Sequence, residues 1–308
     1  MLHLRCICGR AWHVRTIDAT NKRHTIMSLS SHISESGSFA SQNGAAPVLD
    51  TNPVRDQRPT REELLSNLAQ LQLDPHKMPR HIAVIMDGNR RWAKQQSWNA
   101  LRGHTVGANT TRNVIQECSD LGIEALTLYT FSTENWKRSR TEVAALMRLI
   151  SHNLRDQLPD MQKNRVRVRH AGRRDGLPEY LLNQIDKSVA ETQHNNGMTL
   201  TLALNYGGRA ELLDAFQKLA QQVRDRVLEP SAISEEHIEQ MLYTQGLPEP
   251  DLMIRTGGDL RISNFLPWQI AYAELWMTPV LWPDFKTEHL HAGIADFQTR
   301  ERRFGSGK

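Results

Sequence analysis

Short apolar runs alternate with stretches of helical periodicity along most of this chain. Runs typical of strands cover 81–86, 124–131, 165–171, 198–205, 251–254 and 272–277. Helical stretches between them cover 105–121, 140–157, 178–194 and 208–228. Strands that alternate with helices predict a parallel sheet covered by helices on both faces. We therefore expect one α/β domain with a central six-stranded, mostly parallel sheet flanked by helices.

The first part of the chain lacks this alternation. Residues 28–48 are rich in Ser, Ala, Gly and Asn, and residues 1–33 hold five Lys or Arg against one acid. This composition is typical of disorder, and the basic start resembles a transit peptide. A disordered tail, or a true start at Met27, explains the same composition. We expect residues 1–75 to be a mostly disordered extension with a short helix over 60–71, its first 70 residues dispensable for activity, and residues 76–308 to be the folded domain.

The bulk composition excludes several classes of protein. Charged residues make up 23% and hydrophobic residues 39% of the chain, as in ordinary globular proteins. The formal net charge of +4 is too weak to indicate nucleic acid binding, although it suits anionic ligands. Cys6, Cys8 and Cys118 form no CxxC pair, which favours a reducing compartment. No apolar run reaches the ~18 residues that a membrane-spanning helix needs.

The first candidate site lies where a predicted strand ends. The run HIAVI and Met86 are followed by Asp87, Gly88, Asn89 and a pair of arginines, Arg90 and Arg91. Ligands of such sheets bind beyond the carboxyl ends of the strands. A glycine at the turn, the N–H groups of a helix start and two guanidiniums suit a phosphate. Asp87 would repel that phosphate unless a cation such as Mg²⁺ joined them. An aspartate helix cap with two solvated arginines is the alternative.

A second cluster of arginines and glycines follows another predicted strand. In the stretch RTGGDLRISNF, Arg255, Arg261 and Ser263 surround the turn at Gly257 and Gly258. Two guanidiniums, a flexible turn and a hydroxyl predict a second anion-binding loop. A glycine turn with surface arginines is the simpler alternative. The chain contains no GxxxxGK[ST] motif, which argues against a nucleoside triphosphatase.

Two further stretches place polar residues near strand ends. Ser132, Asn135, Trp136 and Arg138 follow the strand predicted over 124–131. His104 lies in the stretch ALRGHTVGA, where it could act as an acid, a base or a phosphate ligand. A structural role is commoner for a single histidine, and only its neighbours favour a functional one.

The predicted helix 140–157 carries an apolar stripe that has two interpretations. Ser139 and Glu142 fit a capping box, which predicts that this helix starts there. Such a stripe packs into the core in most proteins, and it could instead line an apolar channel. Its members are Val143, Leu146, Met147, Ile150 and Leu154.

Taken together, these stretches resemble the cis-prenyltransferases, specifically the bacterial undecaprenyl diphosphate synthases, which are also called isoprenyl transferases. The resemblance covers about 79–305 and rests on five blocks in the same order. These blocks are HIAVIMDGNRRWAK, GH at 103–104, ALTLYTFSTENWKR, LNYGGR at 204–209, and DLMIRTGGDLRISNFLPWQIAYAEL with WPDF and RERRFG after it.

The resemblance implies an activity, a cofactor and partners. Members of this family add isopentenyl diphosphate repeatedly to an allylic diphosphate, usually farnesyl diphosphate, in cis geometry. The product is a long polyprenyl diphosphate such as undecaprenyl diphosphate, a lipid carrier for cell-wall glycans in bacteria. The resemblance also implies Mg²⁺, a homodimer, and a cytoplasmic enzyme peripheral to the membrane that receives the product. An import signal in the first 75 residues would place the enzyme in an organelle instead.

The resemblance also assigns roles to individual residues. Asp87 and Asn135 match catalytic positions, and Asp87 with Glu274 matches the pair that holds Mg²⁺. Arg300–Arg303 match a C-terminal stretch that reaches the partner subunit. Substrate-binding positions are matched by Gly88, Asn89, Arg90, Arg91, Trp92 and His104, by Ser132, Thr133, Glu134, Trp136 and Arg138, and by Arg255, Arg261 and Ser263.

Some positions bear on the details of the activity. Ala100 stands where many relatives have an arginine four residues before the histidine, and Arg102 could supply the missing charge. With the family in view, the apolar stripe of 143–154 becomes a candidate wall of a channel for the growing chain. Leu200 and Leu202 are further wall candidates, and the depth of such a channel depends on a few side chains such as Thr130.

Three alternative functions would require residues other than those found in this chain. A non-catalytic partner subunit of a heteromeric cis-prenyltransferase is the main alternative, although such subunits lack the MDGNRRW block. A trans-prenyltransferase needs DDxxD carboxylates, and this chain contains no Asp-Asp pair. A phosphatase would need a nucleophile or a two-metal carboxylate cluster, and neither is recognisable.

Overall fold

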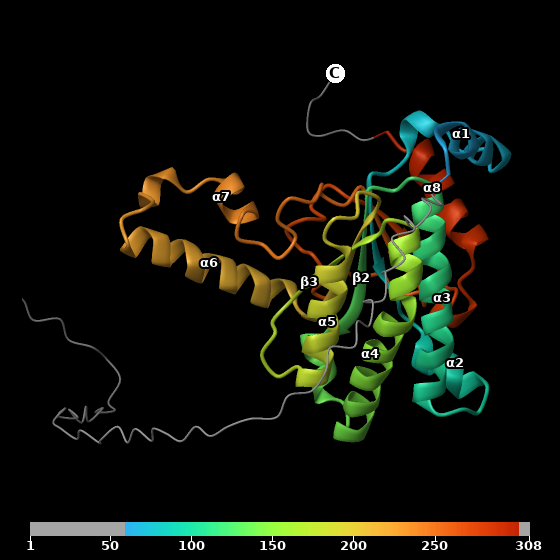
Figure 1. Cartoon of the computed structure of the whole chain (residues 1–308), viewed down its shortest axis with the longest axis horizontal. Coiled ribbons are helices and arrows are strands. Elements are labelled where there is room, and N and C mark those ends of the chain that lie inside the picture. The colour runs from blue at the N-terminus through green and yellow to red at the C-terminus, as the bar shows by residue number, and fades with distance from the viewer. Residues whose placement is uncertain (1–58, 302–308) are drawn as a thin grey trace, which may run out of the picture. The chain divides into compact units, whose positions relative to one another are not determined.

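The six predicted strands form one sheet in the structure, a computed structural model that describes residues 59–301. The strands lie in the order β3-β4-β2-β1-β5-β6, and every neighbouring pair is parallel (Figure 1). The predicted parallel sheet is therefore confirmed. The strands are β1 (His81–Ile85), β2 (Ala125–Ser132), β3 (Arg167–Ala171), β4 (Thr199–Tyr206), β5 (Leu252–Arg255) and β6 (Glu274–Met277).

The four predicted helices are present at the expected places, but their ends differ from the predicted ones. The predicted helix 140–157 continues through Pro159 because Leu158 and Met161 are buried, and their packing offsets the hydrogen bond that proline removes. The helices of the described residues are α1 (Arg61–Gln70), α2 (Asn89–Gln95), α3 (Ala100–Asp120), α4 (Arg140–Lys163), α5 (Glu179–Thr192), α6 (Gly208–Arg224), α7 (Glu235–Glu239) and α8 (Thr287–Thr299).

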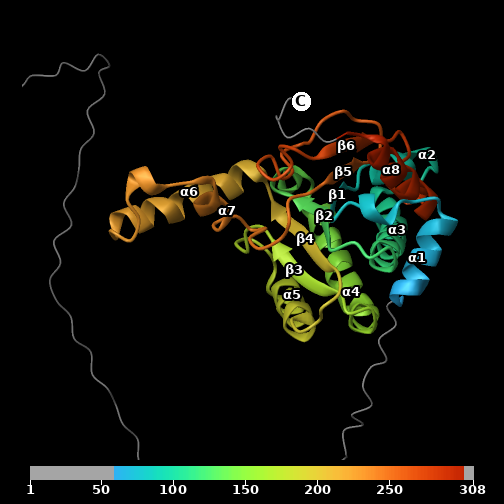
Figure 2. The same ribbon diagram turned by 90° about the horizontal axis from the view of Figure 1, so that it is seen from above.

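Alternate residues of the strands separate into two apolar clusters. Ile82 and Val84 of β1 belong to the larger cluster, which they share with buried residues of α3, α4, α5 and α8. Figure 2 shows α3, α4 and α5 side by side along this face of the sheet. All five residues of β1 are buried, and successive apolar ones join opposite clusters because the two-residue period of a strand points their side chains to opposite faces.

The other face of the sheet differs from the prediction. Ala83 and Ile85 of β1 belong to a smaller cluster with Phe265, Leu266 and Ile270, which come from the segment after β5. Irregular chain rather than a helix therefore supplies the apolar cover of this face. Hydrophobic periodicity does not predict this cover, because the covering segment has neither a strand nor a helix pattern.

Helix α1 belongs to the folded domain. Thr60 caps it with a capping box to Glu63, as its predicted position allows. Leu68 and Leu73 are buried in the larger cluster at 2% and 4% exposure. Residues before the expected domain boundary at 75 therefore already pack into the core. The folded domain includes α1, because this helix buries apolar side chains of its own. The rest of the expected extension lies outside the described residues.

Helices α6 and α7 extend away from the sheet in both views (Figure 2). Leu213 and Phe216 of α6 are about half exposed, at 52% and 50%. Within residues 59–301, no helix combines the length and the apolar character needed to cross a membrane.

Candidate active site

Asp87 and Arg255, predicted as parts of two separate anion sites, meet at the carboxyl edge of the sheet. Arg255 ends β5 and is paired with Ile85, the last residue of β1, so Asp87 lies just beyond the same edge. The Arg255 Nη2 donates a hydrogen bond to Asp87 Oδ2 at 2.8 Å. The two predicted sites therefore form one continuous site.

Arg255 is the buried centre of this site, with 3% of its surface exposed. Its guanidinium also donates to Ser263 Oγ at 2.7 Å, to Asp259 Oδ2 at 3.1 Å and to the carbonyl of Arg261. The guanidinium of Arg261 points elsewhere, is exposed and pairs with Asp259 at 2.6 Å. Arg255 and Ser263 are thus grouped as predicted, whereas Arg261 contributes its carbonyl and not its guanidinium. Protein groups bind both terminal nitrogens of Arg255, and its buried Nε has no hydrogen-bond partner.

Asp87 is held as a carboxylate between two arginines. Its Oδ1 lies 3.2 Å from Arg91 Nη2, on the side away from Arg255. Partial burial acts to raise the pKa of Asp87. The hydrogen bond from Arg255 and the charge of Arg91 outweigh this and leave the pKa below its ordinary value. Asp87 is therefore ionised at neutral pH.

The turns at this edge depend on two glycines. Gly88 starts α2 with a φ of 111°, and Gly257 has a φ of 86°. A Cβ on Gly257 would lie 2.3 Å from Arg91 Nη2, which is the close approach that lets Arg91 Nη1 donate to the Gly257 carbonyl at 2.6 Å. Glycine at both places therefore serves the backbone geometry that the site needs.

The start of α2 packs directly on α3. A Cβ on Gly103 would lie 2.1 Å from the carbonyl oxygen of Asn89, and one on Gly107 would lie 2.2 Å from Asn89 Oδ1. Asn89 Oδ1 and His104 Nε2 are buried atoms without a hydrogen-bond partner. Burial and the charges of Arg138 and Arg90 lower the pKa of His104 to about 4, so it is neutral at pH 7. The protein itself therefore leaves both atoms without a hydrogen bond.

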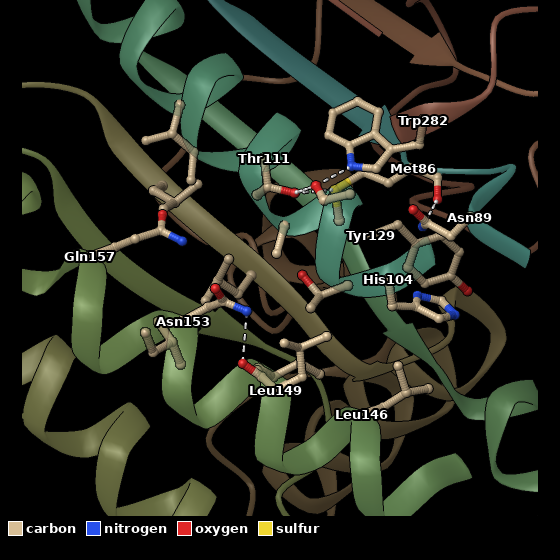
Figure 3. A pocket seen from close by; sticks show the side chains of 18 of the residues that line it. Met86, Asn89, His104, Thr111, Tyr129, Leu146, Leu149, Asn153, Gln157 and Trp282 are labelled. Carbon is tan, nitrogen blue, oxygen red and sulfur yellow. Dashed lines mark hydrogen bonds between the residues drawn. The ribbon is translucent and has the colours of Figure 1, made fainter. Parts of the chain in front are cut away.

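These two side chains lie at one end of an apolar cavity of about 180 Å³ between α3 and α4 (Figure 3). Thr130, Leu200 and Leu202 line it, as the channel interpretation predicted. The stripe on α4 divides: some members face the cavity and others pack elsewhere in the core. Leu146, Ile150 and Leu154 line the cavity, whereas Val143 and Met147 do not and are buried in the larger cluster.

A polar hollow adjoins the mouth of this cavity. Asp87, Ser132, Glu134, Ser263 and Asn264 line it. The two spaces share four lining residues, which form the boundary between them: Met86, Tyr129, Asn135 and Arg138. An apolar space and a polar one therefore meet at the carboxyl edge, next to Asp87.

The predicted loop 132–138 points its residues in different directions. Asn135 and Arg138 face the boundary, and Arg138 Nη1 lies 3.2 Å from Glu142 Oε1. Asn135 also caps the turn by accepting from the Ser132 N–H at 3.1 Å. Thr133 and Trp136 line neither space and instead face a different hollow beside β3 and β4.

Besides Thr133 and Trp136, several residues with an expected ligand role do not line either space, among them Gly88, Arg91, Arg255 and Arg261. Trp92 donates to Asp284 Oδ1 at 2.7 Å, and Arg90 is exposed with its Nε 3.9 Å from Glu142. Arg102 stacks over Trp98 at 5.4 Å and lines neither space, so its suggested role in place of an arginine at position 100 stays a prediction. Glu274 also lies outside both spaces, at the opposite end of its strand from the site.

Glu274 does not meet Asp87 within one chain. It begins β6 opposite Leu252, whereas Arg255, the neighbour of Asp87, lies opposite Met277. Three residues of strand separate these levels, about 10 Å. Glu274 instead accepts from Arg300 Nη1 at 2.8 Å. The expected pairing of Asp87 and Glu274 on one ion is therefore not formed by a single chain, because the two residues sit at opposite ends of parallel strands.

Some residues of the site were not among the predicted ones. Tyr129 and Asn264 line the polar hollow, and Gly107 and Trp282 line the cavity. The spacing of Gly103 and Gly107 in the sequence is a usable signal, because two glycines four residues apart leave one face of a helix bare. Nothing local marks Asn264, which reaches the site only through the fold.

The comparisons with known proteins agree with this geometry. The family model described as "Putative undecaprenyl diphosphate synthase" matches residues 85–305. The ditrans,polycis-undecaprenyl-diphosphate synthase ((2E,6E)-farnesyl-diphosphate specific) of Lactiplantibacillus plantarum is 50% identical over 238 residues, 76% of this chain and 92% of that protein. The isoprenyl transferase of Clostridium tetani is 44% identical over 236 residues, 77% of this chain and 92% of that protein.

A solved structure shares the fold. Lavandulyl diphosphate synthase from Lavandula x intermedia, in complex with dimethylallyl diphosphate, has a TM-score of 0.73 at 37% identity and covers 75% of this chain and 100% of its own. Sequence, fold and the arrangement of charged and apolar spaces thus agree. The chain belongs to the undecaprenyl diphosphate synthase family of prenyltransferases.

Proposed function

We propose that this protein condenses isopentenyl diphosphate repeatedly onto an allylic diphosphate and releases a long-chain polyprenyl diphosphate. The observation that carries the proposal is the junction of two unlike spaces at one edge of the sheet. An apolar cavity with Asn89 and His104 at its mouth meets a polar hollow beside Asp87. Farnesyl diphosphate as primer and undecaprenyl diphosphate as product follow the name of the Lactiplantibacillus relative.

An allylic diphosphate has an apolar tail and a charged head, and each matches one part of the site. The tail fits the cavity between α3 and α4, and the head fits its mouth, where Arg138 and the N–H groups at the start of α2 supply donors. Isopentenyl diphosphate then occupies the polar hollow beside Ser263. The related lavandulyl enzyme was solved with dimethylallyl diphosphate, also an allylic diphosphate.

The reaction breaks one bond and makes another. The bond between C1 of the allylic group and its diphosphate oxygen breaks, and the electron pair leaves with the diphosphate. The double bond of isopentenyl diphosphate attacks C1 through its C4. C2 then loses a proton to an oxygen of the departing diphosphate, and the electron pair of that C–H bond becomes the new double bond. Donors at the mouth stabilise the charge on the departing diphosphate. The apolar wall keeps water from capturing the allylic cation.

The protein would supply one carboxylate, that of Asp87, to a Mg²⁺ ion at this site. Residues 59–301 hold no group of three His, Cys, Asp or Glu side chains suited to a metal. Mg²⁺ commonly binds through one carboxylate, substrate phosphates and waters, and Asp87 is an ionised carboxylate beside the polar hollow. Asp87 would therefore hold the ion together with a diphosphate. The ion, when bound, neutralises charge that builds on the leaving diphosphate.

We also propose a homodimer at the surface of a membrane. Support for the dimer comes from the exposed apolar side chains Leu213 and Phe216 on α6 and Leu275 on β6. Support for the membrane surface comes from the product, whose apolar chain favours transfer from the cavity into lipid. Light scattering of the purified protein would report a mass near twice that of one chain.

Labelled isopentenyl diphosphate tests the proposal. Incubation with farnesyl diphosphate and Mg²⁺ should move label into butanol with time, and EDTA should stop the transfer. Mass spectrometry of the extract then gives the chain length. A folded protein that transfers no label, alone and with every allylic primer from five to twenty carbons, would favour the non-catalytic subunit instead.

A further inference from the structure

The end of β4 carries a buried side chain that the proposed reaction does not use. Asn205 is 6% exposed and has a φ of 52°, in the left-handed region that asparagine enters more readily than most residues. Its Oδ1 accepts a hydrogen bond from the indole N–H of Trp136 at 2.7 Å. Its Nδ2 donates to the carbonyls of Arg173 at 3.0 Å and Asp175 at 2.9 Å.

These partners fix the orientation of the amide. An indole N–H can only donate and a carbonyl can only accept, so the oxygen of Asn205 must face Trp136. The side chain thereby joins two segments that are distant in sequence, the loop 132–138 and the turn 172–176 after β3. Gly172 allows that turn to approach closely, since a Cβ there would lie 2.2 Å from the Leu204 carbonyl.

Trp136 lies between the two loop residues that face the reaction space. Asn135 and Arg138 line the mouth of the cavity, whereas the indole of Trp136 points the other way, packs edge-on against Phe131 at 5.2 Å and reaches Asn205. Asn264 ties this loop to a second distant segment through its bond to Glu134 at 3.0 Å. Local contacts also hold Asn135, through the Ser132 N–H, and Arg138, through Glu142. The bond from Trp136 to Asn205 is the tie that fixes the side of the loop facing away from the cavity.

We propose that Asn205 is a positioning residue for this enzyme: it anchors Trp136 and thereby holds Asn135 and Arg138 at the mouth of the cavity. The inference rests on the proposed function and deepens it. Trp136 then serves as the anchor of the loop, and its N–H is not available to a diphosphate. Misplacing a reacting group by about 1 Å can cost on the order of 100-fold in rate, so a single anchor is sufficient to matter.

Two substitutions isolate the anchor. Trp136→Phe removes the indole N–H and keeps an aromatic ring against Phe131. Asn205→Gly keeps the left-handed backbone, which glycine accepts freely, and removes all three hydrogen bonds. Asn195 offers a matched control, because its Nδ2 also donates to two backbone carbonyls, those of Val166 at 2.8 Å and Met161 at 3.4 Å. It precedes β4, at the edge of the sheet away from the site.

Steady-state kinetics and hydrogen exchange are measured on the full chain for wild type, both single variants, the double variant and Asn195→Ala. We expect Trp136→Phe to lower kcat/KM about 10-fold in the wild-type background, the loss of one hydrogen bond, and less than about two-fold in the Asn205→Gly background. Peptides covering 132–138 should exchange faster in both single variants. Asn195→Ala should speed exchange near 164–167 and leave the loop unchanged.

The proposal is overturned if the effects of the two substitutions on kcat/KM multiply, or if exchange of 132–138 matches wild type in both. If Asn205→Gly does not fold, Trp136→Phe decides alone, since unchanged kinetics and unchanged loop exchange would refute the anchor. Exchange is measured without substrate, so it separates failure of the anchor from failure of the proposed reaction, which the wild-type label assay tests.

Discussion

The charges of the site compensate one another before any substrate binds. Arg255 is buried, and a buried guanidinium is costly unless a carboxylate and hydrogen bonds compensate it. Asp87 and Asp259 both supply that compensation. An incoming diphosphate must therefore compete with Asp87 for the donors of Arg255, or bind beside them. This couples the two anion sites that the sequence presented as separate.

The carboxylate of Asp87 should be essential for turnover while the fold survives its loss. Asp87→Asn keeps the size of the side chain and one hydrogen-bond acceptor for Arg255, but it removes the charge that would hold Mg²⁺. We expect kcat to fall by about 10²–10³-fold or more, with circular dichroism unchanged. Asp259→Asn, which also contacts Arg255, should cost much less. Turnover of Asp87→Asn within about ten-fold of wild type would refute this role.

Ala100 is the residue where an added charge should be informative. It is the first residue of α3, the helix that carries His104 at the cavity mouth. Since Arg102 stacks on Trp98, no guanidinium at 100–102 faces the site. Ala100→Arg should lower KM for the allylic diphosphate about 3- to 10-fold, the typical net value of one hydrogen bond. An unchanged KM, measured with saturating isopentenyl diphosphate, would show that an arginine at position 100 does not strengthen binding of the allylic diphosphate.

At the scale of elements, the contact between α2 and α3 sets the geometry of the mouth. Gly103 and Gly107 let the start of α2 lie against α3, which places Asn89 beside His104. The cavity below is a product of the same arrangement, because α3 supplies one wall and α4 the other. A small change in the distance between α2 and α3 should therefore weaken binding of the diphosphate at the mouth, while the shape of the cavity between α3 and α4 stays the same.

Gly107→Ala tests this contact. The added methyl would lie 2.2 Å from Asn89 Oδ1 and 2.9 Å from Trp282, so α2 or the tryptophan must move. We expect a loss of about 1–3 kcal/mol in the free energy of unfolding and a raised KM for the allylic substrate. Thr105→Ala, on the exposed side of α3, should change neither quantity. Urea denaturation and initial rates provide the two measurements, and a neutral Gly107→Ala would mean that the mouth tolerates the shift.

At the scale of the whole molecule, α1 decides where the domain begins. Leu68 and Leu73 are buried in the core that the sheet shares with α3 and α8. A chain that begins at residue 59 should keep the activity and the Tm of the full chain. One that begins at residue 75 should lose several kcal/mol, since each buried leucine contributes about 1.5–3 kcal/mol. Equal Tm values for the two truncations, measured by calorimetry, would contradict the assignment of α1 to the domain.

Two histidines should make the stability of the domain depend on pH. Burial lowers the pKa of His81 to about 4, and burial with nearby arginines lowers that of His104 to about 4. The unfolded chain protonates them near pH 6.5, so their contribution is complete above that pH. It is lost as pH falls from about 6.5 to 4, by up to about 3 kcal/mol each. His81→Gln should flatten the pH dependence of urea stability in this window, and an identical slope would be evidence against it.

The sequence by itself determined the elements and the chemical character of the site. Apolar runs separated by amphipathic helices specify parallel strands, and polar residues after each run must gather at the carboxyl edge. That reasoning placed Asp87 in one anion site and Arg255 with Ser263 in another at this edge, and the fold joins the two sites through the bond from Arg255 to Asp87. Helical period predicted one apolar stripe that also included Val143 and Met147. Only Leu146, Ile150 and Leu154 of that stripe line the cavity.

Only the tertiary structure decided which predicted residues share a space. Strand register puts Glu274 at the far end of β6 from Asp87, and no local pattern encodes register between strands that are distant in sequence. The direction of Trp136 toward Asn205, and the cover of one sheet face by the segment after β5, likewise depend on long-range packing. Local sequence specifies periodicity and chemistry, whereas the distances between elements result from how they pack together.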